Sequence, residues 1–267
     1  METPYLHSIS IYPIKSMRGQ DIAASLVERM GLQHDRRLMV VDAQGDFITQ
    51  REFAGMALID AHVNGSDMHL AAPGMPGMAF PLRQSGVTES VNIWKSRFVA
   101  AVDQGAQAAE WLSEYLKMNV HLVHIASGYK RKVSHDHAIF EDDHVGFADG
   151  YPILVVSQAS LDDLNGRLPG PVAMNRFRPN LVIGGCEPFA EDQWKRIRVG
   201  EVELALVKPC ARCQMPNIEQ ETGLITKETI ATLSEYRRFD GKIMFGVNAI
   251  PIHTGAIQRG ARVDILE

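Results

Sequence analysis

The sequence predicts a mainly β protein: a β-barrel with peripheral helices, preceded by an N-terminal β-rich domain. Three observations lead to this class. Apolar segments are mostly short, turn residues separate them, and helical patterns occur singly instead of alternating with strands. A chain of 267 residues can hold two modest domains. We place the boundary before the first helix, so that the domains comprise residues 1–105 and 106–267.

The first hundred residues mostly have the pattern of β-strands. Residues 8–12 alternate polar and apolar side chains, as a half-buried strand does. The pair Asn64-Gly65 lies between two apolar segments and predicts a β-hairpin, because both residues tolerate the backbone of a tight turn. A loop is expected at the proline- and glycine-rich residues 72–77. Further strands are expected at residues 37–41, 47–49, 59–63, 68–70 and 91–102.

Three segments have helical patterns. In residues 106–118, apolar side chains recur at every third or fourth position and form one face. Asp103 is expected to cap the start of this helix, and Asn119 to close it. Ser157 is the expected N-cap of a second helix. The second and third helices are expected at residues 158–168 and 227–237, and the remaining strands at residues 120–124, 153–156, 180–183, 196–199, 202–207 and 261–266.

Composition and charge exclude several classes of function. The chain has 45% hydrophobic and 22% charged residues, as ordinary globular proteins do, and its formal net charge of -5 offers no basic surface for nucleic acid. The first residues do not predict a secretion signal, and no apolar run reaches the roughly 20 residues of a membrane span. Three cysteines fit a reducing compartment. We therefore expect a cytoplasmic protein with no nucleic-acid and no membrane partner.

Cys210 and Cys213, in the segment KPCARC, are the first candidate site. The apolar alternation of residues 202–207 predicts a strand that ends where Pro209 interrupts the ladder, so both thiols are expected at a strand end. The guanidinium of Arg212 between them favours the thiolate form, which binds metals and attacks electrophiles. The alternative is a pair of small buried side chains, which is a common role of free cysteine.

No regular ligand spacing predicts a zinc site. Zinc would need histidines beside the cysteines, and the residues rich in His and Asp, 134–144, are interpreted more simply as a polar, solvated loop. An iron–sulfur cluster held by four thiolates cannot be built from three cysteines, of which Cys186 is the third.

Basic residues recur at the predicted ends of strands and loops. If these segments converge, they form an anion pocket, because arginine can bind phosphate through two hydrogen bonds. The alternative is scattered, exposed charge. Ser16 adds a hydroxyl group beside Lys15 that could join a phosphate cradle. The basic residues are Lys15, Arg18, Arg36, Arg37, 130–132, Arg176, Arg178, Lys208 and Arg212.

A carboxylate precedes the strand predicted at residues 153–156. Asp149 stands there in the sequence Asp149-Gly150-Tyr151-Pro152. A carboxylate at the entrance of a strand can move protons or orient a ligand. The alternative is a simple Asp-Gly turn.

Six short motifs, taken in their order along the chain, resemble those of the MOSC-domain proteins. The similarity is to the branch with an added N-terminal β-barrel domain, which contains the bacterial YcbX-type proteins and the mitochondrial amidoxime-reducing components. Each motif alone is weak, but six in the right order are specific. The motifs are YPIKS (12–16), DRR (35–37), DGYP (149–152), NRFRPN (175–180), CARC (210–213) and GARV (260–263).

The resemblance implies a molybdenum cofactor and gives no reason to expect pyridoxal phosphate. Cys213 matches the cysteine that binds molybdenum, and Asp149 matches an active-site carboxylate. Cys210 and Arg212 would position Cys213 or tune its electronics. The residues matching those that hold the pterin and its phosphate are Lys15, Ser16, Arg36 and Arg178, with Asn180, Gly150 and Tyr151 as further contacts. Gly150 and Tyr151 depart from the small hydroxyl residues of eukaryotic members.

The resemblance also implies the reduction of N–O bonds in N-hydroxylated compounds such as hydroxylamines, amidoximes and N-hydroxylated bases. Asp149 is the expected proton-transfer group. No cysteine follows Cys213, whereas YcbX-type relatives often carry a C-terminal domain with four cluster cysteines. We therefore expect electrons from a separate ferredoxin-, flavodoxin- or cytochrome-type protein with its reductase, which docks near the site.

Two other functions fit the cysteine pair. Other MOSC relatives suggest a sulfur carrier, with a persulfide on Cys213 that serves metal–sulfur cluster assembly. Such a carrier needs no converging cations. The second is a dithiol redox module, which would need both Cys210 and Cys213, whereas the molybdenum hypothesis strictly needs only Cys213.

Overall fold

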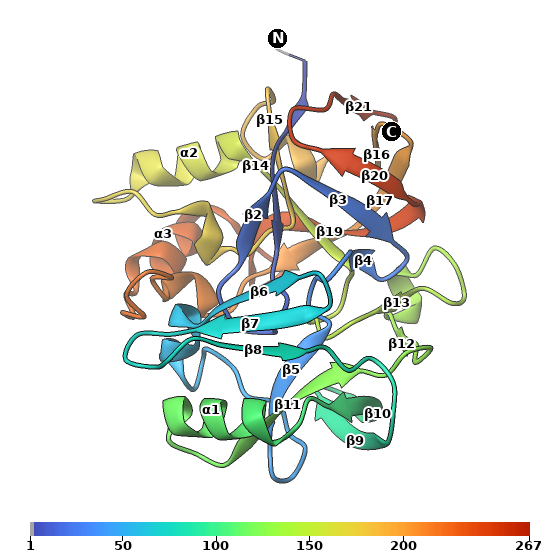
Figure 1. Cartoon of the computed structure of the whole chain (residues 1–267). Coiled ribbons are helices and arrows are strands. Elements are labelled where there is room, and N and C mark those ends of the chain that lie inside the picture. The colour runs from blue at the N-terminus through green and yellow to red at the C-terminus, as the bar shows by residue number, and fades with distance from the viewer. Residues whose placement is uncertain (1–2) are drawn as a thin grey trace.

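In the computed structural model, which describes residues 3–267, a nine-stranded sheet forms the larger part of the protein. Its order is β2-β1-β15-β14-β19-β17-β16-β21, and β18 pairs with β19. This confirms the mainly β class. Most of these strands lie in the upper half of Figure 1. The strands are β1 Tyr5–Ile11, β2 Gln20–Ile22, β14 Ile153–Ser157, β15 Leu181–Gly184, β16 Arg196–Val199, β17 Val202–Ala211, β18 Arg238–Phe239, β19 Lys242–His253 and β21 Val263–Ile265.

Backbone hydrogen bonds connect β21 and the segment before it to β1 and the residue before β1. The N–H of Leu6 in β1 donates to the carbonyl oxygen of Ala261, and the N–H of Gly260 donates to the carbonyl of Leu6, both at 2.8 Å. The N–H of Val263 reaches the carbonyl of Pro4 at the same distance. The segment before β21 thus returns to the first strand, which curves the sheet into a half-barrel.

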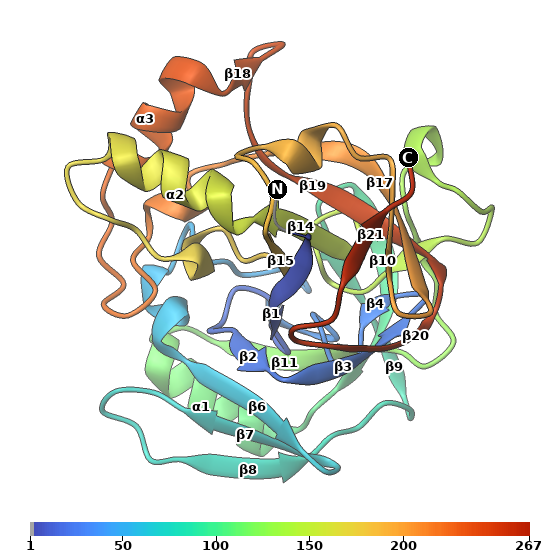
Figure 2. The ribbon, with the colours of Figure 1, turned by 90° about the horizontal axis from the view of Figure 1, so that it is seen from above.

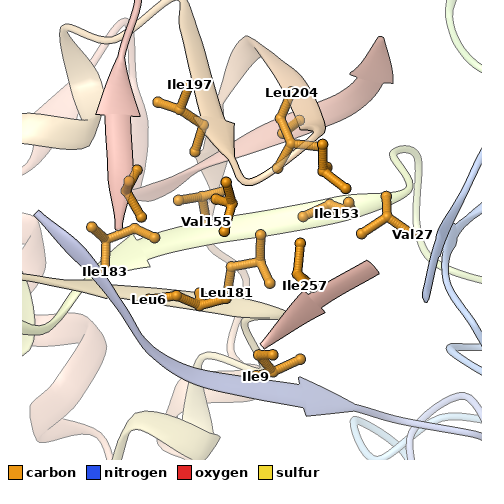
Figure 3. Packing of buried hydrophobic residues seen from close by; sticks show 14 of the residues in the cluster. Leu6, Ile9, Val27, Ile153, Val155, Leu181, Ile183, Ile197, Leu204 and Ile257 are labelled. Carbon is orange, nitrogen blue, oxygen red and sulfur yellow. The ribbon is translucent and has the colours of Figure 1, made fainter. Parts of the chain in front are cut away.

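Alternation along the strands decides which side chains enter the barrel. Ile153 and Val155 of β14 and Leu181 of β15 point to a common centre (Figure 3), where they are buried with Leu204 of β17. Leu154, which lies between the first two, therefore faces outward, because successive side chains of a strand point to opposite sides. On this outer side of the sheet Leu154 borders a pocket.

The N-terminal part forms smaller sheets at the end of the molecule away from both termini (Figure 1). One has the order β5-β11-β10-β9, and another the order β6-β7-β8. The bounds are β5 Leu38–Asp42, β6 Asp60–Asn64, β7 Asp67–Ala71, β8 Met78–Pro81, β9 Thr88–Ile93, β10 Ser96–Asp103 and β11 Val120–Ile125. The pairing of Asn64 with Asp67 confirms the predicted hairpin.

The remaining short strands connect these two parts. β20 pairs with β3, which pairs with β4, and Figure 2 shows β3 beside β20. β11 lies beyond residue 105 but pairs with β5 and β10, so strands from both predicted domains belong to one sheet. The division at residue 105 stays a prediction. The bounds are β3 Ala24–Glu28, β4 Gly31–Leu32, β12 Arg131–Lys132, β13 His144–Val145 and β20 Gly255–Gln258.

Three α-helices lie outside the sheets of the described residues: α1 Ala106–Leu116, α2 Gln158–Arg167 and α3 Glu228–Tyr236. The N-cap prediction for α2 is confirmed, because the Ser157 side chain accepts a hydrogen bond of 3.1 Å from the N–H of Ser160. α2 also connects β14 to the parallel strand β15, so the fold does contain a βαβ unit. Within residues 3–267 no helix is both long and apolar enough to cross a membrane.

The predicted caps of α1 are wrong. Asp103 belongs to β10, and its carboxylate accepts a hydrogen bond of 3.0 Å from the N–H of Gly105, which is the actual N-cap residue. At the other end, Lys117 takes the left-handed conformation (φ 57°) and stops the helix before Asn119. The apolar periodicity located the helix correctly, but the sequence did not reveal at which residues the backbone leaves the helical conformation.

Three strand predictions also need correction. Residues 91–102 are a hairpin, because Trp94 (φ 52°) and Lys95 reverse the chain between β9 and β10. Residues 47–49 contribute only a single bridge, between Phe47 and Val41. β17 continues past Pro209 to Ala211. It does so because the pairing with β19 shifts register on both sides of Pro209, where a proline costs little.

Candidate functional site

A pocket of about 770 Å³, including its open mouth, lies on the outer side of β14 and β19. It is lined by Leu154 and Asn248, which alternate with core residues of these two strands. All the predicted site residues line this same pocket: Lys15, Ser16, Arg36, Asp149, Gly150, Tyr151, Arg178, Asn180, Cys210, Arg212 and Cys213. The structure therefore brings them together, while the role of each stays a prediction.

Several lining residues were missed by sequence reasoning. Leu154 and Asn248 could have been found from strand alternation, since each is flanked by buried apolar residues. Phe177 lies inside the NRFRPN motif but was not singled out. The missed lining residues are Ala148, Leu154, Phe177, Ala211, Met215 and Asn248.

Three residues of the pocket have left-handed backbones although none is glycine. The φ angles are 66° for Ser16, 45° for Arg36 and 56° for Arg178. Side chains other than those of glycine, Asn and Asp rarely adopt this conformation, which costs of order 1–3 kcal/mol per residue at such sites. The surrounding structure holds these three strained backbones in place, and all three residues line the pocket.

Arg36 and Arg178 share one aromatic partner. Their guanidinium carbons lie 4.1 and 4.2 Å from the ring centroid of the buried Tyr12. Such contacts attract a cation to the electron-rich face of the ring. Burial, with repulsion from Arg36, lowers the pKa of Arg178 to about 10, so it is still a cation at neutral pH. Two like charges are thus held against the same ring and repel each other.

The carboxylate of Asp35 is one counterion of this pair. Its Oδ2 accepts a hydrogen bond of 2.8 Å from Nη1 of Arg36, and its Oδ1 accepts one of 2.9 Å from the N–H of Tyr12. Nη1 of Arg36 also donates to Oδ1 of Asn180 at 3.0 Å. The same amide oxygen accepts from the N–H of Leu154, so Asn180 connects Arg36 to β14. This gives Asn180 a structural role beside its predicted contact.

Arg178 has hydrogen-bonding capacity left for a ligand. Its Nη1 donates to the carbonyl oxygen of Met17 at 2.7 Å. Its Nη2 is buried and has no hydrogen-bond partner among the described residues. A buried donor without a partner is rare and costly. An anionic oxygen bound in the pocket would supply the missing acceptor.

Lys15 and Asp149 form an ion pair in the pocket. Nζ of Lys15 also donates to the carbonyl oxygen of Phe147 at 3.0 Å, and burial lowers the pKa of Lys15. The protein around Asp149 shields it from part of the solvent, which by itself would raise its pKa, although the side chain is 68% exposed. Attraction by Lys15 and hydrogen bonds from Lys15 and Trp94 outweigh this effect and hold the pKa well below its usual range. Asp149 is therefore ionised at neutral pH.

The two thiols differ in their surroundings. Cys210 is half-buried, and its Sγ accepts a hydrogen bond of 3.1 Å from Nη1 of Arg212. Nη2 of Arg212 donates to the carbonyl oxygen of Phe177 at 2.7 Å, which fixes the guanidinium. Cys213 lies beyond the end of β17 and is exposed. Cys213 is thus the accessible thiol, and Cys210 is held by its neighbour.

Several other predicted members of the basic cluster lie outside the pocket, which corrects the broader prediction. Arg18, Arg37, Arg176 and Lys130 form ion pairs with carboxylates elsewhere. Lys208 does not line the pocket but lies 5.8 Å from the ring centroid of Tyr151. Across residues 3–267, no three His, Cys, Asp or Glu side chains gather as a metal site.

A curved β-sheet that presents cations, a carboxylate and an accessible thiol around one pocket is the class of protein that this fold and site define. Comparison with family models narrows this class. Residues 3–119 match the MOSC N-terminal beta barrel domain, and residues 142–264 match the MOSC domain. The chain belongs to the MOSC family, in the branch that carries this N-terminal domain.

Curated relatives extend the similarity over most of the chain. This chain is 34% identical over 242 residues to mitochondrial amidoxime-reducing component 1 of Danio rerio, and the alignment covers 87% of this chain and 74% of that protein. It is 32% identical over 276 residues to the Homo sapiens component 1, covering 96% and 81%. The solved YUAD protein of Bacillus subtilis aligns over 98% of this chain and 94% of its own, at 10% identity and a TM-score of 0.45.

Proposed function

We propose that this protein is an oxidoreductase that reduces N-hydroxylated compounds, with a molybdenum cofactor in the pocket and electrons from a separate protein. The observation that carries the proposal is the convergence of Lys15, Arg36, Arg178 and Cys213 on one pocket. Family membership and the names of the amidoxime-reducing relatives support the reaction class. Proposed substrates are hydroxylamines, amidoximes and N-hydroxylated bases.

The pocket fits a pterin cofactor with a phosphate group. The unpartnered Nη2 of Arg178 needs an acceptor, and phosphate oxygens are strong acceptors. Arg36 and Lys15 add positive charge around the same pocket, and the strained Ser16 adds a hydroxyl group. Cys213 supplies a soft thiolate ligand of the kind that suits such a metal. The donor set therefore agrees with an anionic cofactor next to a thiolate-bound metal.

Each side chain then has a defined task. Arg36, Arg178 and Ser16 would hold the phosphate and pterin, and Asn180 would fix Arg36. Cys213 would bind the metal, while Arg212 positions Cys210 behind it. Gly150 and Tyr151 would border the cofactor at the pocket wall.

When bound, the cofactor would supply the two-electron chemistry that breaks an N–O bond, which no side chain can supply. Asp149 is ionised, so it accepts hydrogen bonds from groups that carry protons, but its low pKa makes it a poor proton source at neutral pH. Lys15 holds its proton against Asp149 inside the pocket. Release of water from the substrate takes up two protons, and we assign the relay of protons to this pair.

Electrons would come from a ferredoxin-, flavodoxin- or cytochrome-type protein with its reductase. The exposed Cys213 marks the side of the pocket on which such a donor would dock. A cytoplasmic location remains a prediction.

The sulfur-carrier alternative is favoured by one observation, since an exposed cysteine can pass a persulfide to a partner. The converging cations favour the reductase, because a carrier has no use for them.

Elemental and pterin analysis tests the proposal. The protein is purified from a host that makes molybdenum cofactor, beside the variants Cys213→Ala and Cys186→Ala. Cys186 lies outside the pocket and serves as the control. We expect equimolar molybdenum and pterin in the wild type and control, and loss of molybdenum in Cys213→Ala. Cyanide-labile sulfur on Cys213 without molybdenum or pterin would identify the carrier instead.

The dithiol hypothesis is tested with serine variants of the same cysteines. The reductase hypothesis expects Cys210→Ser to keep its molybdenum and most of its activity, because Cys210 only accepts a hydrogen bond from Arg212. Cys213→Ser should lose activity. Equal loss of activity in both variants, with molybdenum absent from the wild type, would favour a dithiol module.

A further inference from the structure

Trp94, from the N-terminal part of the chain, lies beside the pocket and contacts one of its lining residues, Asp149. It is the first residue of the two-residue turn between β9 and β10. Its φ is 52°, and a residue with such a positive φ at this position of a hairpin turn is usually glycine. A bulky residue with such a backbone is unusual, and it persists only where its surroundings hold it. Neither the predicted site nor its motifs include Trp94.

The indole group of Trp94 is bonded to Asp149. Its Nε1–H donates a hydrogen bond of 3.1 Å to Oδ1 of Asp149, the same oxygen that pairs with Nζ of Lys15. Both hydrogen bonds that the structure gives this carboxylate thus end on one oxygen. The second oxygen, Oδ2, remains free, and the side chain of Asp149 is 68% exposed in the open pocket.

Other side chains hold the indole in this orientation. The guanidinium carbon of Arg51 lies 4.3 Å from the ring centroid of Trp94. Phe47 packs against the same ring, with centroids 4.9 Å apart and an angle of 58° between the planes. The hairpin residue is therefore fixed by two neighbours, and it fixes the rotation of the carboxylate in turn.

We infer that Trp94 is a positioning residue for substrate recognition. It holds Asp149 by Oδ1 so that Oδ2 faces the pocket as an acceptor for an N–H or O–H group of the substrate. The inference rests on the proposed function. An amidoxime, whose amino and hydroxyl groups are both donors, is one substrate that could bind to this oxygen.

A spectrum of the indole N–H groups tests the hydrogen bond without any turnover. The chain has three tryptophans, so Trp94→Phe assigns one of three signals in ¹⁵N-labelled protein. We expect Asp149→Ala to shift the Trp94 signal strongly, because its acceptor is removed. An unchanged Trp94 signal in Asp149→Ala would overturn the inference.

Kinetics with benzamidoxime test the role in recognition. In cofactor-loaded Trp94→Phe the aromatic ring remains but the donor is lost, and we expect KM to rise about tenfold with kcat nearly unchanged. Phe98→Leu is the matched control, because Phe98 lies on β10 of the same hairpin and is 77% exposed. An unchanged KM in Trp94→Phe, or an equal rise in Phe98→Leu, would also count against the inference.

The two proposals can fail separately. Absence of benzamidoxime turnover by loaded wild-type protein would contradict the proposed function alone. Benzamidoxime is then titrated into the labelled protein while the Trp94 signal is followed. A saturable shift that disappears in Asp149→Ala would support recognition by the carboxylate, and no shift in the wild type would overturn it.

Discussion

Nη2 of Arg36 donates a hydrogen bond of 2.9 Å to the carbonyl oxygen of Arg178, which lies 142 residues further along the chain. The bond joins a segment before β5 to the segment before β15. It holds two cations together that would otherwise repel each other, and both guanidinium groups contact the ring of Tyr12. The site is therefore assembled by contacts between the two parts of the chain.

Arg178 should lower the stability of the cofactor-free protein, although it contributes to cofactor binding. It is buried, repelled by Arg36, and leaves Nη2 without a partner. We expect Arg178→Gln to reduce the retained cofactor at least about tenfold, because a charged hydrogen bond is lost. The free energy of unfolding of the cofactor-free variant should stay within about 1 kcal/mol of the wild type or rise. Molybdenum analysis and urea unfolding measure the two effects.

Arg198→Gln is the control for that experiment, because Arg198 lies outside the pocket in an ion pair with Asp264 at the surface. It should change neither quantity appreciably. Full cofactor retention by Arg178→Gln would contradict the assigned role of Arg178.

Glu191 should make the protein less stable as the pH rises. The residue is fully buried, and burial raises its pKa. Its Oε1 accepts hydrogen bonds from Ser157 and Ser160, but Oε2 has no partner. A carboxyl group whose pKa is raised on folding contributes stability below its unfolded pKa, and this contribution is lost as the pH rises through the folded value. The affected window therefore lies above the usual pKa of glutamate.

Glu191→Gln tests this sign, because glutamine does not titrate. Urea unfolding between pH 5 and pH 8 should show little difference from the wild type at pH 5 and a growing stabilisation, of about 1 kcal/mol or more, toward pH 8. The exposed Glu187→Gln is the control and should show no such trend. A stabilisation that shrinks toward pH 8 would reverse the conclusion.

Gly246 is needed where β19 passes closely over β14. Its φ is 76°, and an added Cβ would lie 2.6 Å from Cγ2 of Val156 and 2.8 Å from the carbonyl oxygen of Val155. Gly241 has nearly the same φ, 75°, with no atom within 4 Å. Gly241→Ala should therefore cost about 1 kcal/mol, and Gly246→Ala about 3 kcal/mol or more, since the clash adds to the strain. Equal costs in urea unfolding would show that crowding at Gly246 is unimportant.

Local patterns predicted the elements whose signals are local. The Asn64-Gly65 turn and the Ser157 cap depend on residues next to them in sequence, and both predictions are confirmed. The continuation of β17 through Pro209 was missed, because it depends on the register of β19 some forty residues later. Trp94 was missed for the same kind of reason: its partner Asp149 lies 55 residues away.

By itself, the sequence determined the β character of the chain and, through the order of its motifs, which residues meet in one pocket. Only the tertiary structure decided which neighbours of those residues take part. Arg36 lines the pocket, whereas the adjacent Arg37 points to Glu28 at 2.8 Å. Arg178 likewise lines it, whereas Arg176 pairs with Glu219. The direction of a side chain follows from the backbone angles and the pairing of distant strands, and neither is encoded in the residue type.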